Sequence, residues 1–548
     1  MIEAIQDEEL VKADIRNQER MEAERMPWEG LWREIDERFP DGAGGFNRDG
    51  PGQVRGQRNY DTTHITANER FAAAGVAITT PETQDYIKPR FADPELMKIR
   101  GVQLWCEAAG RRMYDIRHAQ HTGFIIAANE DWGQLGRYGT SLIWTDVRQG
   151  RGLFYRTLHL ANCWIDTDYA GLVDTVHRKF EWTARELEQF FGIEALTQKM
   201  RDALDQPGKE HTKFEVLQRV SPNTVWDQDR FDHRRFPISS RFLALDEKVY
   251  LRRSGFHTMP ISASRHITGP EEKYGRSPAI NLKPAIDGLN AMKHTILRSA
   301  HKLSDPALLF SDDDGITRLS TKPGGMNPGL VDEQGRAKVQ RMPGGENGIP
   351  FALEMMEQER GAIRNAFLEE FFKILNAPNS RMTTTEVLEV MAKQGVLVRP
   401  YASRYAAEKQ FPMSNRDLDI ALRNEQIDPL PPEVQEAGAW PLIDYENPLA
   451  AMARAESTSK SLRYLEAIVP LANAQQDVLD RIDADAMARG MAEEIGVRAS
   501  YIRSDVDVAR IRAARAEAEQ SAIDADLLAK SAGATLDFAK AGAVSEAA

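Results

Sequence analysis

The sequence predicts an α+β fold that is mostly helical. Apolar residues recur at helical spacing in long stretches, most clearly at 277–303. Aromatic and β-branched residues with partial alternation fill 137–182, which is typical of strands. A shorter group of strand-like segments lies between helical segments at 205–265. The chain has 548 residues, of which 42% are hydrophobic and 28% charged, so it can bury a sizeable core in several domains.

The first 130 residues are expected to be mainly helical. Residues 1–39 place large apolar side chains on one helix face: Trp28, Leu31, Trp32, Ile35 and Phe39. Further helices are expected at 61–80 and 94–130. The Gly-rich stretch 41–56 is expected to be a surface loop, because no Gly-Lys-Ser/Thr follows it as a P-loop requires.

The middle of the chain combines a capped helix with strands. Thr183 and Glu186 are placed for a capping box, and we expect one helix over 183–204. Strands are expected at 213–220 and 241–253, the second folded as a hairpin about Asp246, Glu247 and Lys248.

The segment 277–303 is the clearest predicted helix. Ser277 can cap it and Pro278 suits its first position. Apolar residues keep a 3-4 alternation that Lys293 interrupts: Leu282, Ile286, Leu289, Ile296, Ala300 and Leu303. We therefore expect this helix to pack against copies from adjacent subunits.

Two helices with a break between them are predicted further on. The first covers 351–376, and Pro378 bars its continuation. Thr383 and Glu386 form a second capping box, which starts a helix running to about Phe411. The last hundred residues are rich in Ala and contain a long predicted helix at 504–530.

Composition excludes several functional classes. The 83 acidic and 70 basic side chains give a net charge of −13, whereas tight nucleic-acid wrapping requires a basic surface. Cys106 and Cys163 are the only cysteines, which excludes a disulfide framework and a Cys-based zinc site. The sequence contains no run of about 18 apolar residues, so no membrane span is expected. The charged first residues do not suggest a signal peptide.

No catalytic motif is recognisable. The sequence has no H-E-x-x-H, Walker A or G-x-S-x-G pattern. His118 and His121 share a predicted helix face but lack further metal ligands nearby, so a structural role is favoured. Asp312, Asp313 and Asp314 precede Gly315 as ordinary turn residues do. We expect no enzyme activity, no cofactor and no metal.

Two segments resemble the portal, or head-to-tail connector, proteins of short-tailed bacteriophages. The first is 271–315, where Tyr-Gly-Arg-Ser-Pro opens a helix that ends at Asp-Pro and precedes an Asp-Gly turn. The second is Ser380–Val387, similar to the family's Arg-x-Thr-x-x-Glu helix start. The N-terminal helix from Trp28 to Pro40, followed by Tyr60–Thr63, also fits the family, so the matches cover most of 25–425 in the same order and spacing.

The resemblance implies a portal fold with wing, stem, clip and crown or barrel, in a ring of about twelve copies around a channel for double-stranded DNA. Implied partners are a terminase packaging motor, capsid and scaffolding proteins and a tail adaptor protein. The implied role covers procapsid initiation, genome packaging, retention and ejection, and tail attachment. The implied location is the portal vertex of the virion, after assembly in the host cytoplasm.

The resemblance assigns one region name to each part of the chain. The assignments are 1–182 wing, 183–204 first stem helix, 205–265 clip, 266–303 second stem helix, 304–440 wing with a tunnel loop near 376–382, and 441–548 crown and C-terminal barrel.

Three groups of site residues follow from this assignment. Asn379, Ser380 and Arg381 are expected to form the channel constriction, where Arg381 can bond DNA phosphates. Lys293 and Arg298 are expected to line the stem channel. Contacts between the clip and its partners are expected from Arg234, Arg235, Arg252 and Arg253. The alternative function is a ring adaptor of the virion that binds partners but conducts no DNA.

Overall fold

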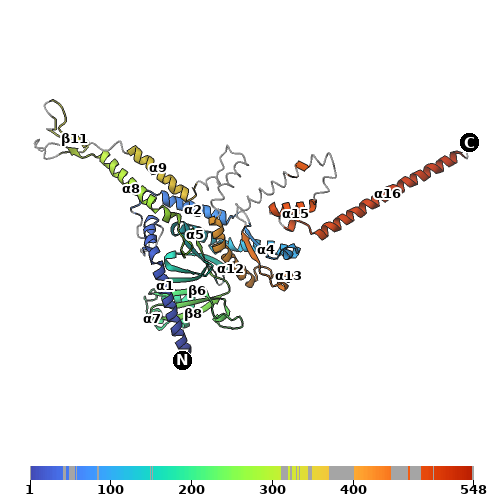
Figure 1. Ribbon diagram of the computed structural model, residues 1–548, viewed down its shortest axis with the longest axis horizontal. Coiled ribbons are helices and arrows are strands. Elements are labelled where there is room, and N and C mark those ends of the chain that lie inside the picture. Colours follow the sequence, from blue (N-terminus) through green and yellow to red (C-terminus); the bar gives the residue numbers. More distant parts are fainter. Residues whose placement is uncertain are drawn as a thin grey trace. The chain divides into compact units, whose positions relative to one another are not determined.

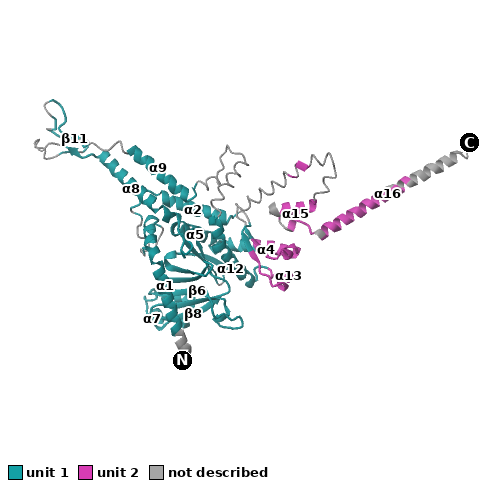
Figure 2. Cartoon of the chain, in the orientation of Figure 1, with its two compact units in different colours: residues 1–87, 112–427, 443–452 teal, residues 88–111, 428–442, 453–548 magenta. Residues whose placement is uncertain are grey.

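The structure of the chain is a computed structural model. It describes residues 2–40, 45–47, 56, 58–82, 85–148, 150, 152–309, 319–320, 322, 324–328, 330–331, 334–342, 349–369, 400–445, 464, 467–468, 483–495, 497 and 499–545. The chain divides into two compact units (Figure 2). Unit 1 comprises 1–87, 112–427 and 443–452, and unit 2 comprises 88–111, 428–442 and 453–548.

Helix α1 (Ile2–Arg38) begins unit 1 and confirms the expected first helix. Apart from Asp36, its buried residues are three, four or seven apart, as one helix face requires: Val11, Asp14, Gln18, Met21, Arg25, Trp32 and Ile35. The stripe mixes apolar with polar side chains because part of this face meets polar side chains of a sheet.

The larger sheet has five strands in the order β4-β5-β6-β7-β8, each antiparallel to its neighbour. The strands are β4 (Cys163–Thr167), β5 (Val173–Thr183), β6 (Lys213–Pro222), β7 (Ile238–Ala244) and β8 (Val249–Phe256). The predicted hairpin is confirmed, with Lys248 at φ 56° in its turn. One face contacts α1 through Lys179, Arg219 and Tyr250.

The opposite face of this sheet packs against two short helices, α6 (Ala184–Phe191) and α7 (Gln198–Asp205). The expected single helix over 183–204 is therefore wrong. The capping box of Thr183 and Glu186 does start a helix, but Gly192, at φ 81°, ends it after eight residues. Apolar residues of both helices then reach the same sheet face, with Leu187 and Met200 among them.

The expectation of a separate β region at 205–265 is also wrong. Strands β6, β7 and β8 extend the sheet that β4 and β5 begin, and Val176 of β5 pairs directly with Val220 of β6. The assigned boundary between wing and clip would cut this sheet between hydrogen-bonded strands. Residues 205–265 thus belong to the body of unit 1.

A smaller sheet, in the order β3-β2-β9, lies in the same unit. Its strands are β2 (Thr140–Arg148), β3 (Gly152–Leu158) and β9 (Ile261–Arg265). Helix α5 (Phe124–Tyr138) leads into β2 through Gly139, at φ 77°, and α2 (Thr63–Thr79) packs on α5. A Cβ at Gly139 would lie 2.3 Å from the Gly275 carbonyl oxygen, so the close approach of these two segments requires glycine.

Helices α8 (Pro278–Ser304) and α9 (Ile349–Ala366) lie side by side and run in opposite directions (Figure 1). The Ser277 hydroxyl caps α8 by accepting from the Ile280 N–H at 3.0 Å, as expected, and Pro284 lies inside the helix. Between them, β10 (Leu308–Leu309) and β11 (Gln340–Arg341) form an antiparallel pair. Along the chain, residues 305–348 connect the two helices.

Leu289 does not form the expected seam between subunits. It is buried in the main core of its own subunit, together with Ile286 of α8 and Met356 and Ile363 of α9. The 3-4 alternation does mark a packed face, but Leu289 packs against α9 of the same chain.

A π-turn (Ala406–Gln410) and α12 (Phe411–Arg423) follow where the described chain resumes at Pro400. Most of the expected helix over 383–411, and the break at 376–382, lie outside the described residues. The remaining short elements of the fold are β1 (Ile87–Arg90), β12 (Leu442–Tyr445), and the 3-10 turns Gln120–Thr122, Leu160–Asn162, Ile193–Ala195 and His233–Arg235.

Unit 2 is small and mainly helical. Its elements are α3 (Pro94–Lys98), the part of α4 (Arg100–Arg117) up to residue 111, α13 (Pro432–Glu436), α15 (Ala484–Ile495), Ala499–Tyr501 and α16 (Asp505–Ser545). The Arg100 guanidinium donates to the Ile502 carbonyl at 2.6 Å, and the Ser500 N–H donates to Glu107 at 3.2 Å. The start of α16 is thereby fixed to α4, while its large apolar side chains, such as Leu527 and Leu528, are exposed.

None of the described helices is long and apolar enough to cross a membrane.

Candidate channel and contact sites

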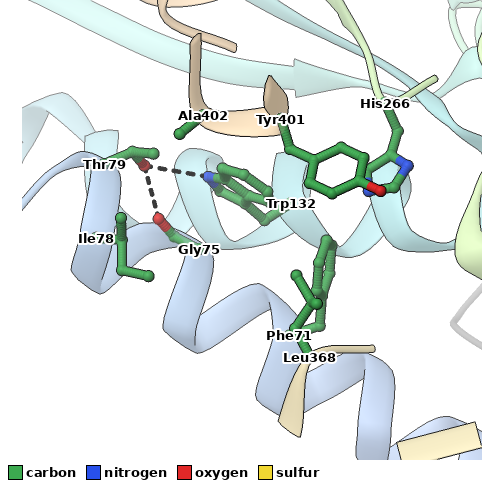
Figure 3. Close-up of a pocket in the computed structure, with 9 residues that line it drawn as sticks. All are labelled: Phe71, Gly75, Ile78, Thr79, Trp132, His266, Leu368, Tyr401 and Ala402. Atoms are coloured by element: carbon green, nitrogen blue, oxygen red, sulfur yellow. Dashed lines mark hydrogen bonds between the residues drawn. The ribbon is translucent and has the colours of Figure 1, made fainter. Parts of the chain in front are cut away.

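The predicted constriction residues Asn379, Ser380 and Arg381 lie outside the described residues. The described chain stops at Glu369 and resumes at Pro400, and the two flanking segments come together (Figure 3). Leu368 on one side and Tyr401 on the other line the same small cavity. Both ends of the segment that carries the predicted constriction are therefore close together on unit 1.

Aromatic contacts anchor both flanks to unit 1. Tyr401 stacks on His266, with ring centroids 4.5 Å apart and planes 10° apart. Phe367 meets Phe71 of α2 edge to face at 5.9 Å. Burial lowers the pKa of His266 to about 4, so this ring is neutral at pH 7. The anchoring is thus largely apolar.

The cavity itself does not have the chemistry of a ligand site. Its lining is mainly aromatic and aliphatic, and none of its lining residues is an acid, a lysine or an arginine. Its Thr79 hydroxyl is satisfied, because it accepts from Trp132 Nε1 at 3.3 Å and donates to the Gly75 carbonyl at 2.7 Å (Figure 3). The cavity is a packing gap beside the two flanks.

The predicted channel-lining residues Lys293 and Arg298 both lie on α8. Arg298 is exposed and Lys293 is half-buried. Five residues apart on a helix, they point in directions about 140° apart. They therefore point to different sides of α8, and their expected place in the stem channel stays a prediction.

Where the end of α8 meets the start of α9, the two helices carry charges of opposite sign. Residues 288–304 of α8 contain Lys293, Arg298 and Lys302 and no acidic residue. Residues 349–359 of α9 contain three glutamates and no lysine or arginine. Apolar side chains are exposed beside them, with exposed fractions of 66% for Phe351 and 39% for Leu297.

The four predicted clip arginines do not form one surface. Arg234 and Arg235 lie in the loop between β6 and β7, whereas Arg252 and Arg253 are neighbours within β8. Successive residues of a strand point to opposite faces of the sheet. Consistently, Arg252 lies over Phe190 of α6, while Arg253 lies over Tyr250, which bonds to Asp14 of α1.

The β6–β7 loop itself is an exposed feature that the sequence analysis missed. Trp226 and Phe231 have exposed fractions of 52% and 97%. The loop is nevertheless held in shape, since Trp226 Nε1 donates to the Arg235 carbonyl at 3.1 Å and the Asn223 amide donates to the Phe236 carbonyl at 2.9 Å. Aromatic residues close to arginines in this part of the sequence could have indicated a contact surface, because both residue types are enriched at interfaces.

Histidine and acidic clusters provide no metal site among the described residues. His118 packs between Tyr86 and Tyr114, and burial together with the Arg117 charge lowers its pKa to about 4. It is therefore a structural side chain. Asp312, Asp313 and Asp314 lie outside the described residues.

A model of the family described as "Bacteriophage head to tail connecting protein" matches residues 13–502. The chain belongs to this connector family. The match extends over both units and includes the helix pair, so the resemblance found in two short segments is confirmed over nearly the whole chain.

Two curated relatives of this connector are portal proteins of phages. The "Probable portal protein" of Bordetella phage BPP-1 is 26% identical over 531 residues, covering 93% of this chain and 91% of the relative. The "Portal protein" of Salmonella phage epsilon15 is 23% identical over 512 residues, covering 91% and 90%. The expected identification as a phage portal protein at a capsid vertex is thereby confirmed.

Solved structures similar to this connector come from gene transfer agent particles. A chain of the neck of an empty particle, computed with C6 symmetry, gives a TM-score of 0.34 at 13% identity, covering 74% of this connector and 87% of that chain. A chain of the neck of a native particle, computed with C12 symmetry, gives 0.32 at 12% identity, covering 71% and 94%. Members of this family connect the head of a phage to its tail.

Proposed function

We propose that this connector forms a ring of about twelve copies that conducts double-stranded DNA into and out of the capsid. The observation that carries the proposal is the antiparallel pair of α8 and α9 around residues 305–348. A portal requires two stem helices that enclose a clip, and this is the helix pair of unit 1 that encloses a small β element. The expected clip at 205–265 is replaced by 305–348.

The other regions follow from this assignment. The two sheets with α1, α2 and α5 are the wing, and α16 belongs to the C-terminal barrel. The segment between α9 and the π-turn carries Asn379, Ser380 and Arg381 and forms the channel constriction. The close approach of Leu368 and Tyr401 supports this, because a loop with neighbouring ends projects as one unit.

The proposed partners meet different regions. The packaging motor and later the tail adaptor bind the clip at 305–348, and scaffolding and capsid proteins bind the wing. Assembly takes place in the host cytoplasm. The exposed loop between β6 and β7, with Arg234, Arg235 and Trp226, is a second contact surface for capsid-side partners.

A deletion experiment tests the assignment of the clip. Residues 310–339 are replaced by a short Gly-Ser turn, which joins Leu309 to its strand partner Gln340. Negative-stain microscopy should still show rings with a central pore, whereas DNA packaging into procapsids in vitro should be lost.

The matched control shortens the β6–β7 loop by replacing 225–234 with the same short Gly-Ser turn. The control tests the assignment of the clip to 205–265. Control rings that have been incorporated into procapsids should package DNA like the parent, because we assign this loop to capsid-side contacts and not to the motor. Packaging that survives the first deletion but not the second would contradict the new assignment. Rings without a continuous pore in the parent protein would instead indicate the alternative, a ring adaptor that conducts no DNA.

A further inference from the structure

The outward faces of α8 and α9 carry opposite charges, and the two charged regions lie at the same end of the helix pair. On α8, Thr295, Arg298 and Lys302 are exposed and spaced three and four residues apart, so they form one stripe. On α9, Phe351, Glu354 and Gln358 form the corresponding exposed stripe. Because the helices are antiparallel and joined at β10 and β11, the end of α8 lies beside the start of α9.

Both stripes point away from the contact between the two helices. That contact is made by Leu289, Met292 and Ile296 of α8 and by Met356 and Ile363 of α9. Arg298 is two positions from Ile296, and Glu354 two positions from Met356, which places each about 160° around its helix from the packed residue. A subunit therefore exposes a basic stripe on one side of the pair and an acidic stripe on the other.

These charges have no ion-pair partner among the described residues. Lys283, nearer the core, pairs with Asp287 and Glu34, and Glu357 pairs with Arg360 and Arg364 within α9. No such pair involves Arg298, Lys302 or Glu354 within the described part of the chain. The apolar Phe351 and Met355 beside Glu354 are also exposed, at 66% and 40%.

We propose that the basic stripe of α8 (Thr295, Arg298, Lys302) docks on the acidic and apolar stripe of α9 (Phe351, Glu354, Gln358) in the next copy of the chain. The inference rests on the proposed ring. Identical subunits in a ring meet through two different surfaces, one on each side, so these surfaces must be complementary. Docking pairs the unpaired charges and covers Phe351.

Charge complementarity of this kind mainly decides which surfaces meet. The same charges also have a second effect, which the test must distinguish from contact between copies. Cations stabilise the C-terminal end of α8 and acids stabilise the N-terminal start of α9, because they interact favourably with the helix dipoles. Charge exchange between copies distinguishes the two effects. Only contact between copies allows a defect in one chain to be repaired by another chain.

The test uses three full-length variants. Variant A carries Arg298→Glu and Lys302→Glu, variant B carries Glu354→Arg and Gln358→Arg, and variant C carries all four changes. A control with Arg185→Glu and Lys199→Glu makes the same charge change as variant A on α6 and α7. Circular dichroism establishes that each chain is folded, and size-exclusion chromatography with light scattering gives the ring mass.

Variants A and B should each require roughly tenfold higher subunit concentration to form rings, because like charges then face each other. An equimolar mixture of A and B should form rings at the parent concentration, and so should variant C. The control should form rings like the parent. This pattern depends on salt, and the defect of A and B should shrink at high ionic strength.

Several outcomes would overturn the inference. Rings of A and B that form as readily as those of the parent would show that these stripes do not meet. If neither mixing nor variant C repaired the defects of A and B, the charges would act only by stabilising the ends of their own helices. If A or B did not fold, variant C would decide, since rings of C support the inference and their absence contradicts it. These outcomes are read from ring mass alone. The proposed function is tested separately, by the pore seen in microscopy and by DNA packaging.

Discussion

The ammonium of Lys409 lies 2.7 Å from Asp131 Oδ1, and both side chains are fully buried. Its other two protons go to the carbonyl oxygens of Ser141 and Ser262, at 3.0 and 2.9 Å. All three donors of the ammonium are thus satisfied. The pair joins the π-turn to α5, β2 and β9, and burial lowers the pKa of Lys409.

Lys409→Met should destabilise the folded subunit by about 3–5 kcal/mol, because it leaves the Asp131 carboxylate buried without a cation. Changing Asp131→Asn in the same chain should recover part of this loss. Urea unfolding measures both differences. Lys12→Met, which breaks an exposed pair with Glu8 on α1, is the control and should change stability by less than about 1 kcal/mol. Equal losses in the two cases would refute this account of the buried pair.

Stability should fall in mild acid because of His177. Burial and the neighbouring Arg219 and Arg241 charges lower the pKa of His177 to about 3 in the folded state, against an ordinary value of 6.5. The neutral ring therefore contributes its full stability above pH 6.5, and this contribution declines as the pH falls from 6.5 towards 3. At pH 5 the linked loss is about 2 kcal/mol.

His177→Gln is the variant that checks this pH dependence. Unfolding free energies at pH 7 and pH 5 should differ less in the variant than in the parent. The neutral ring donates from Nδ1 to Gln18 at 2.9 Å, and glutamine can retain one such bond. An unchanged pH dependence would mean that other groups cause the acid sensitivity.

Leu289→Ala should destabilise the subunit itself by about 2–5 kcal/mol, because Leu289 is 1% exposed in the main core. Leu297→Ala, eight residues further along α8 and 39% exposed, should leave subunit stability within about 1 kcal/mol of the parent. Thermal unfolding of dilute subunits compares them. The reverse order would restore the original expectation that Leu289 faces a neighbouring copy.

Truncation after Ser504 should leave rings intact. The described side chains of α16 are mostly exposed, so its removal uncovers little apolar surface within the subunit. The contacts of Arg100 and Glu107 with residues 500–502 remain, because these residues precede the cut. Light scattering should give a ring whose mass falls only by the residues removed. Loss of the ring would show that α16 is required for assembly.

Arg381→Ala should allow packaging to begin normally but should let DNA leak from filled heads. The expectation follows from the proposed constriction, where about twelve copies of Arg381 contact phosphates. Genome length in purified heads, measured by gel electrophoresis, checks it. Arg364→Ala, in a surface pair on α9, serves as the control. Full-length genomes in Arg381→Ala heads would eliminate the retention role.

Local signals in the sequence predicted many of the elements correctly. The caps at Ser277 and Thr183 and the hairpin turn at Lys248 are all present, because each depends on residues close together in the chain. The pairing of elements was predicted less well. Whether a β segment joins an existing sheet depends on hydrogen bonds such as those between β5 and β6, and nothing in the alternation of one strand reveals its neighbour.

The same limit explains why the sequence suggested a separate β region at 205–265. Two helical segments around 205–265 suggested stem helices, but the first is short and packs its apolar face on the sheet. The pair that we propose as the stem, α8 and α9, flanks a Gly- and Pro-rich segment in which the described strands β10 and β11 have only two residues each. Such short strands leave almost no alternation to detect. The unpaired charges of the helix pair were visible only once the two helices were aligned.

The Asp14 carboxylate restricts how this protein can diverge. It is 2% exposed, bonds to Arg219 and Tyr250, and lies 3.2 Å from the Arg241 guanidinium. Two cations of neighbouring strands thus depend on one acid of α1, more than 200 positions away in the chain. A neutral residue at 14 leaves both arginines repelling each other across β6 and β7. Lineages that lose this acid should therefore also replace an arginine, so that positions 14, 219 and 241 vary together as one evolutionary unit.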